Sequence, residues 1–83
     1  MSRGALVAVL LAACGPSQEC RDYVACQQAV DATVDGEDVD VGAYDDNGSC
    51  WALPQSAREC TAICVQALAA LRELPAPPAA CLE

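Results

Sequence analysis

The chain has 83 residues, a length that allows at most one small domain. Four arginines and no lysine stand against twelve aspartates and glutamates, so the formal net charge is -8. Nucleic-acid binding needs a basic surface, and this composition excludes it as the main function. Histidine is absent as well, so the usual general base and the commonest metal ligand are both missing.

Seven cysteines are a high fraction for a chain of this size. Such a content is typical of a disulfide scaffold made in an oxidising compartment. A chain this short buries little apolar surface, and disulfides usually supply the missing stability. Because seven is odd, one cysteine must have a role that differs from the others.

The first residues have the pattern of a secretory signal peptide. Arg3 is followed by nine uninterrupted apolar residues, Ala5 to Ala13. This run is too short to cross a bilayer as a helix, which takes about 20 residues. We therefore assign residues 1–13 to a signal peptide, 14–16 to a tether and 17–83 to a folded domain. The less favoured alternative is a short apolar helix packed on the domain, with Cys14 in a disulfide.

Leu11-Ala12-Ala13-Cys14 resembles the lipobox of bacterial lipoproteins. The resemblance implies that diacylglycerol is attached to the Cys14 thiol, that the signal is cut before this residue, and that the new amino group is acylated. It thus implies a membrane anchor, and Gly15 in place of an inner-membrane retention Asp implies the outer membrane. The cysteine pattern from Cys20 to Cys81 is loosely similar to small cysteine-rich lipoproteins of myxobacteria, a similarity that brings no activity with it.

Residues 17–34 are predicted to form the first helix. Ser17 is a good N-cap, and Gly36 is a plausible stop. The apolar residues between them recur at helical spacing, interrupted by Gln27. They are Cys20, Tyr23, Val24, Val30 and Val34.

Residues 35–53 are rich in glycine and acids and predict an irregular, solvated loop. Its oxygen-bearing side chains are of the kind that calcium takes, but the EF-hand order is absent, and we favour a solvated loop over weak calcium binding. They are Asp38, Asp40, Asp45, Asp46 and Asn47. Tyr44 and Trp51 are candidate contacts for a protein partner, since exposed aromatics often anchor interfaces. The alternative for Trp51 is a lid on the small core.

Residues 54–74 carry the clearest helical pattern. Its start has two candidates: Pro54 as the first helical residue, or Ser56 with Glu59 as a capping box. The apolar positions follow a 3-4 spacing and predict one buried face. They are Cys60, Ile63, Cys64, Ala67, Leu68, Leu71 and Leu74.

We expect a small all-α, disulfide-rich fold, an antiparallel two-helix hairpin with a long acidic loop. With Cys14 assigned to lipid, six cysteines remain, which allow fifteen full pairings. The preferred set is Cys20–Cys81, Cys26–Cys64 and Cys50–Cys60, because in a hairpin the late part of the first helix faces the early part of the second. The runner-up set is Cys20–Cys64, Cys26–Cys60 and Cys50–Cys81.

No catalytic constellation is present, since the serines have no histidine to activate them. We expect neither an enzyme, nor a metal site, nor a cofactor. The leading hypothesis is a cell-envelope protein held in the membrane through lipid on Cys14, acting as a small structural or binding module. The alternative is a secreted effector or inhibitor that engages a foreign protein through the 38–51 loop.

Overall fold

The computed structural model describes residues 15–34, 36 and 38–83, so the lipobox and Cys14 lie outside the described residues. Two α-helices, α2 (Gln18–Asp31) and α3 (Pro54–Arg72), form the body of the molecule. Three short 3-10 helices accompany them: η1 (Gly42–Tyr44), η2 (Ser49–Trp51) and η3 (Ala79–Cys81). No strand occurs in the described part of the chain, and three disulfides cross-link it. The expected small, helical, disulfide-rich class is confirmed.

Helix α2 begins at its predicted cap and ends earlier than predicted. The Ser17 hydroxyl accepts a hydrogen bond from the Cys20 backbone N–H at 3.4 Å. The helix ends at Asp31, and the hydroxyl of Thr33 donates to the Val30 carbonyl at 2.8 Å just beyond that end. Val34 is 58% exposed, so no burial favours a further helical turn there. Gly36 has φ 137°, a backbone conformation that residues with a side chain rarely adopt and that glycine allows.

Helix α3 begins at Pro54, the first of the two predicted starts. Leu53 is its N-cap and makes no side-chain capping bond, and Pro54 occupies the first turn. Proline suits this position because its φ is already helical and its missing N–H is not needed there. The capping box at Ser56 and Glu59 is therefore not the start of the helix.

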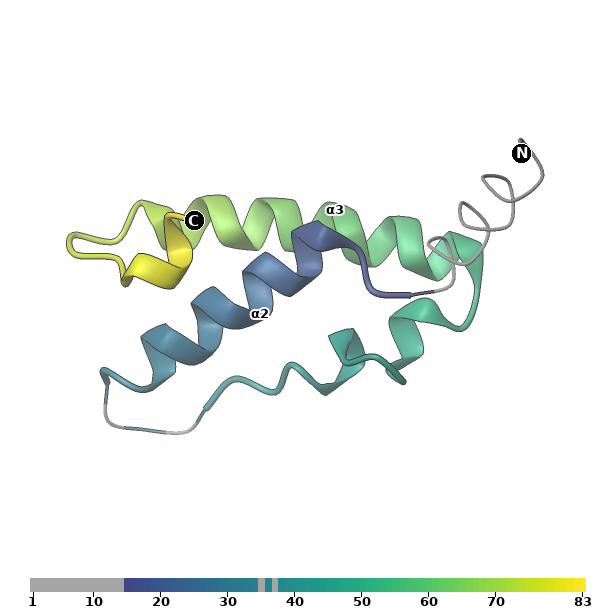
Figure 1. The fold of residues 1–83 in the computed structure, drawn as a ribbon, viewed down its shortest axis with the longest axis horizontal. Coiled ribbons are helices and arrows are strands. Elements are labelled where there is room, and N and C mark those ends of the chain that lie inside the picture. The colour runs from purple at the N-terminus through teal and green to yellow at the C-terminus, as the bar shows by residue number, and fades with distance from the viewer. Residues whose placement is uncertain (1–14, 35, 37) are drawn as a thin grey trace, which may run out of the picture.

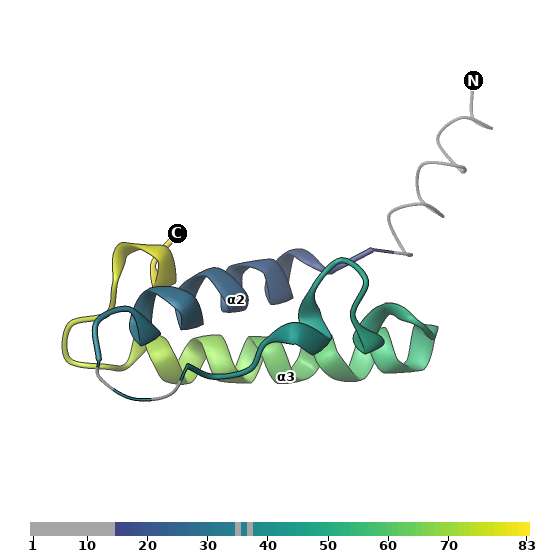
Figure 2. The ribbon, with the colours of Figure 1, turned by 90° about the horizontal axis from the view of Figure 1, so that it is seen from below.

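The two helices run in the same direction, so the antiparallel hairpin expected from the sequence is wrong. The Thr61 hydroxyl donates to the Ser17 hydroxyl at 2.8 Å, and Cys20 is bonded to Cys64. Both pairs are 44 residues apart, and a constant offset is the register of parallel elements. Figures 1 and 2 show the purple start of α2 and the green start of α3 towards the same end of the molecule.

The connection after α2 makes the parallel arrangement possible. Residues 38–53 return along the two helices, so that α3 starts near the end where α2 starts (Figure 2). An α-helix of 14 residues is only about 21 Å long, and an extended chain covers roughly 3.3 Å per residue. The connection therefore has ample length to span α2. It is also less irregular than expected, because η1 and η2 interrupt it.

The disulfides follow from this topology. They are Cys20–Cys64, Cys26–Cys81 and Cys50–Cys60. Cys50–Cys60 was expected, whereas the preferred partners of Cys20 and Cys26 were wrong; the runner-up set contained Cys20–Cys64. In the parallel pair the start of α2 faces the middle of α3. The tail then folds back over α2, where η3 brings Cys81 to Cys26 (Figure 1).

Disulfide-bonded cysteines make up most of the core. Cys20, Cys26, Cys64 and Cys81 have no exposed surface, and Tyr23, Val41 and Leu68 complete the buried cluster. The predicted apolar face of the second helix is wider than the face that is buried. Ile63 is 51% exposed, because the narrow contact with α2 covers only the centre of that face. Leu74 is 40% exposed, because α3 ends at Arg72, two residues earlier than predicted.

This pairing predicts the products of a non-reducing digest that cuts after arginine and before aspartate. Cys60 and Cys64 then share one peptide, and each other cysteine of the domain lies on a peptide of its own. We expect two linked products in the mass spectrum. One joins the peptides of Cys20 and Cys50 to the shared peptide, and the other joins those of Cys26 and Cys81. A product that joins the peptides of Cys20 and Cys81 would contradict the structure.

Candidate functional site

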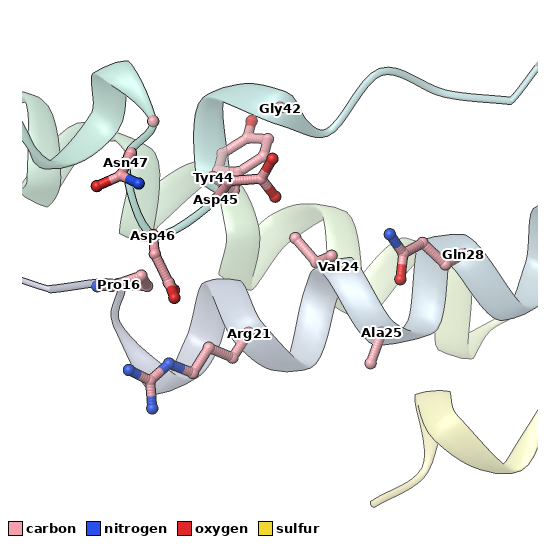
Figure 3. Close-up of a pocket in the computed structure, with 11 residues that line it drawn as sticks. Pro16, Arg21, Val24, Ala25, Gln28, Gly42, Tyr44, Asp45, Asp46 and Asn47 are labelled. Carbon is pink, nitrogen blue, oxygen red and sulfur yellow. The ribbon is translucent and has the colours of Figure 1, made fainter.

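A groove of about 610 Å³ lies between α2 and the turn formed by residues 42–48. Arg21, Val24 and Gln28 line it from α2. Facing residues of the turn line the other side (Figure 3). They are Gly42, Tyr44, Asp45, Asp46, Asn47 and Gly48. The residues that line the groove therefore include an arginine on one side and two aspartates on the other.

The turn that forms one side of the groove is held by tight backbone contacts. The Gly48 N–H donates to the Asp45 carbonyl at 2.8 Å, and the Gly42 N–H donates to an Asp40 carboxylate oxygen at 2.9 Å. A Cβ atom on Gly48 would lie 2.1 Å from the Ala43 carbonyl oxygen. Only glycine allows so close an approach, so the sequence Asn47-Gly48 fixes the shape of this side.

Two aromatic residues connect the turn to the core. The rings of Tyr44 and Tyr23 meet edge to face, with centroids 5.6 Å apart at 83°. The Trp51 indole N–H donates to the Tyr44 carbonyl at 3.3 Å, and both side chains pack against the buried cluster. Of the two predicted partner contacts, Tyr44 lines the groove, whereas Trp51 is not among the groove residues and packs on the core.

A line of hydrogen bonds along α2 was not anticipated from the sequence. The Tyr23 hydroxyl donates to Gln27 at 3.1 Å, and the Gln27 amide donates to Asp31 at 2.9 Å. The second oxygen of Asp31 accepts from the Val39 N–H at 3.0 Å. The line therefore ties α2 to the returning segment. Its signal in the sequence is the spacing of four between Tyr23, Gln27 and Asp31, which places them on one side of a helix.

Burial raises the pKa of Tyr23 above its ordinary value of 10.0, and the charges on Tyr44 and Asp31 act in the same direction. The unfolded chain therefore ionises first, so the stabilising effect is complete below pH 10 and is lost as the pH rises through the higher folded value. We expect the free energy of unfolding, measured with urea, to fall above this pH. The free energy of unfolding of Tyr23→Phe should fall less steeply with pH than that of the wild type. Equal slopes for the two proteins would contradict this assignment.

The aspartates of the loop are split between two hollows rather than gathered. Asp45 and Asp46 line the groove, while Asp38 lines a smaller hollow of about 230 Å³ beside Asp31. The Asp40 carboxylate accepts a hydrogen bond from the Gly42 N–H. Within the described ranges, no group of three or more acidic or cysteine side chains is placed to hold a metal ion.

The six cysteines of the described domain are all in disulfides, so none of them offers a thiolate. No α-helix of residues 15–83, as far as they are described, combines the length and the apolar character that crossing a bilayer requires. The chemistry available at the groove is thus hydrogen bonding and charge pairing through Arg21, Gln28, Asn47 and the two aspartates. Arg21 and Gln28 were not singled out from the sequence, because nothing in the pattern of α2 shows which exposed residues face the turn.

Comparisons with protein-family models, with curated proteins and with solved structures found no match to this chain.

Proposed function

We propose that this chain is a cell-envelope lipoprotein, anchored through lipid on Cys14 in the outer membrane, that acts as a small structural or binding module. The proposal rests on the lipobox-like sequence Leu11-Ala12-Ala13-Cys14. One observation from the fold supports it: the six other cysteines pair among themselves, so the domain does not require a seventh.

The tether between lipid and domain is short under this proposal. Ser17 is already fixed, because it caps α2 and its hydroxyl is bonded to Thr61. From Cys14 to Ser17 an extended chain reaches at most about 10 Å. The domain therefore stays next to the membrane surface rather than at the end of a long linker.

The groove is the part of the module that we propose binds a partner. Its side at residues 42–48 is rigid, since Gly48 approaches the Ala43 carbonyl closely, and the Tyr44 ring is backed by Tyr23. A preformed surface loses little conformational entropy when a ligand binds. Its mixed charges suit a polar ligand, such as an extended segment of another envelope protein.

The anchor is tested by metabolic labelling with a fatty-acid analogue. We expect label on the wild-type protein and none on Cys14→Ala, because the thiol is the acceptor of the lipid. Gly15→Ala is the matched control: it changes the next residue, leaves Leu11 to Cys14 intact and should be labelled. A Cys14→Ala protein that is labelled as strongly as wild type would refute the proposed anchor.

A secreted effector or inhibitor is the second candidate. Exposed residues on the 42–48 turn, Ala43 and Asp45 to Asn47, favour it, because a rigid, exposed turn is a suitable contact for a foreign protein. In this reading Tyr44 and the 38–51 segment engage the target. An unlipidated form recovered from culture medium would favour the second candidate over the anchored module.

A further inference from the structure

Helix α3 leaves one long face without a partner among the described residues. Cys64 and Leu68 are its buried residues, and they face α2. Val65 follows Cys64 directly and so lies about 100° around the helix from it, and its side chain is 49% exposed. Between Glu59 and Arg72 no residue of α3 carries a charge. The outer face of α3, defined here as the exposed residues of this uncharged stretch on the Val65 side, is made of Ala62, Val65, Gln66 and Ala69.

The acids of the described chain are concentrated away from this face. Helix α3 contains Arg58 and Arg72 against Glu59 alone. Residues 15–34, 36 and 38–53 contain one arginine, Arg21, against seven acids. These acids are Glu19, Asp22, Asp31, Asp38, Asp40, Asp45 and Asp46. In Figure 1, α3 forms the upper edge of the molecule, and the returning segment with the last four of these acids forms the lower edge.

The chain towards Cys14 leaves the domain beside α3. The Ser17 hydroxyl accepts a hydrogen bond from Thr61 at 2.8 Å. Thr61 is three residues after Arg58 and four before Val65, so the three lie along one flank of α3. Only Gly15 and Pro16 separate Ser17 from Cys14. A lipid on Cys14 therefore lies within about 10 Å of the Ser17 backbone and close to this flank.

We infer that the outer face of α3 lies on the bilayer surface, and this inference rests on the proposed lipid anchor. The uncharged face meets the headgroup region with Val65, and Arg58 on the same flank is placed to pair with lipid phosphates. An anionic surface repels the acids on the far side, so the charge distribution selects the same orientation. The lipid anchor supplies the affinity for the membrane. The outer face of α3 sets the orientation of the domain, in which the groove points away from the membrane.

The test uses a tryptophan as a depth probe in the lipidated protein. Val65 and Val39 are exposed to nearly the same extent, 49% and 47%, but lie on α3 and on the acidic segment respectively. Val65→Trp and Val39→Trp are therefore matched variants, each made with Trp51→Phe. Each is placed in vesicles of phosphatidylethanolamine and phosphatidylglycerol whose acyl chains are brominated, since bromine quenches nearby indoles. Flotation of the vesicles reports the anchor separately.

We expect both variants to float with the vesicles, and only Val65→Trp to lose most of its fluorescence to brominated lipid. If both float and both are quenched alike, the inference is wrong and the anchor stands. If neither floats, the proposed anchor fails and the inference fails with it. A Val65→Trp emission that shifts to the blue with protein concentration, and not with bromine, would show that a second copy covers this face. If Trp51→Phe disturbs folding, the variants are compared in the wild-type background, where Trp51 contributes equally to both.

Discussion

Removal of the Cys26–Cys81 bridge by alanine at both positions should lower the free energy of unfolding by about 4 kcal/mol. The bridge joins residues 55 apart, but the intact Cys20–Cys64 bridge shortens the loop that it closes, and for the shorter loop the chain-entropy model gives roughly 3 kcal/mol. It is also the covalent link between the tail and α2. Both sulfurs lie in the core with no exposed surface, so lost packing adds to the effect.

The matched control removes the shortest bridge, Cys50–Cys60, again with alanine at both positions. Its partners are 10 residues apart, for which the same model gives roughly 3 kcal/mol. Urea unfolding of the two double variants measures the difference directly. Equal losses, or a larger loss for the Cys50–Cys60 variant, would show that the burial of Cys26 and Cys81 adds nothing to the effect of loop closure.

Gly48→Ala should lower the free energy of unfolding by about 1–3 kcal/mol, the usual cost of forcing an extra group into a filled space. The new Cβ would lie 2.1 Å from the Ala43 carbonyl oxygen and 2.8 Å from that of Gly42. Both atoms are backbone, so the turn itself must move. The Gly48 bond to the Asp45 carbonyl and the shape of the groove should change with it.

Gly15→Ala is the control, because a Cβ there meets nothing within 4 Å. It should leave the urea midpoint of the domain unchanged. Amide hydrogen exchange supplies the second measurement. In Gly48→Ala the protection of the Trp51 and Ala52 amides, which donate to the Gly48 and Ser49 carbonyls, should fall, whereas the protection of the α2 amides should stay constant. A Gly48→Ala domain as stable as the control would mean that the turn adapts without cost, and that it is no rigid side of a binding groove.

Signals that act over a few residues predicted the local parts of the fold. Ser17 caps α2 as its hydroxyl chemistry demands, and Pro54 opens α3 because its φ is preset. The Cys50–Cys60 bridge followed from the short distance along the chain. Each of these features depends on near neighbours, so no knowledge of the tertiary fold is needed to predict it.

The direction of α3 depended on the path of the connection, and nothing in the composition of residues 35–53 fixes that path. A short link would force an antiparallel pair, whereas this one is long enough to return along α2. The error in direction produced the errors at Cys20 and Cys26. The candidate groove was missed for the same reason, since it exists only where the returning turn lies beside α2. Tyr44 was singled out as an aromatic, but Arg21 and Gln28 look like any exposed helix residues.

The order in which the three bridges connect the chain also decides what proteolysis does to this protein. Cys20–Cys64 and Cys26–Cys81 both cross the exposed segment 38–49, so a cut there leaves the two pieces joined twice. A cut in the tail between Cys64 and Cys81 leaves the last piece attached through Cys26. Every single cut between Cys20 and Cys81 yields a nicked molecule and no free fragment. If the proposed lipid anchor is present, a protease that attacks the exposed turn would leave the whole domain attached to it, and release would require a cut before Cys20.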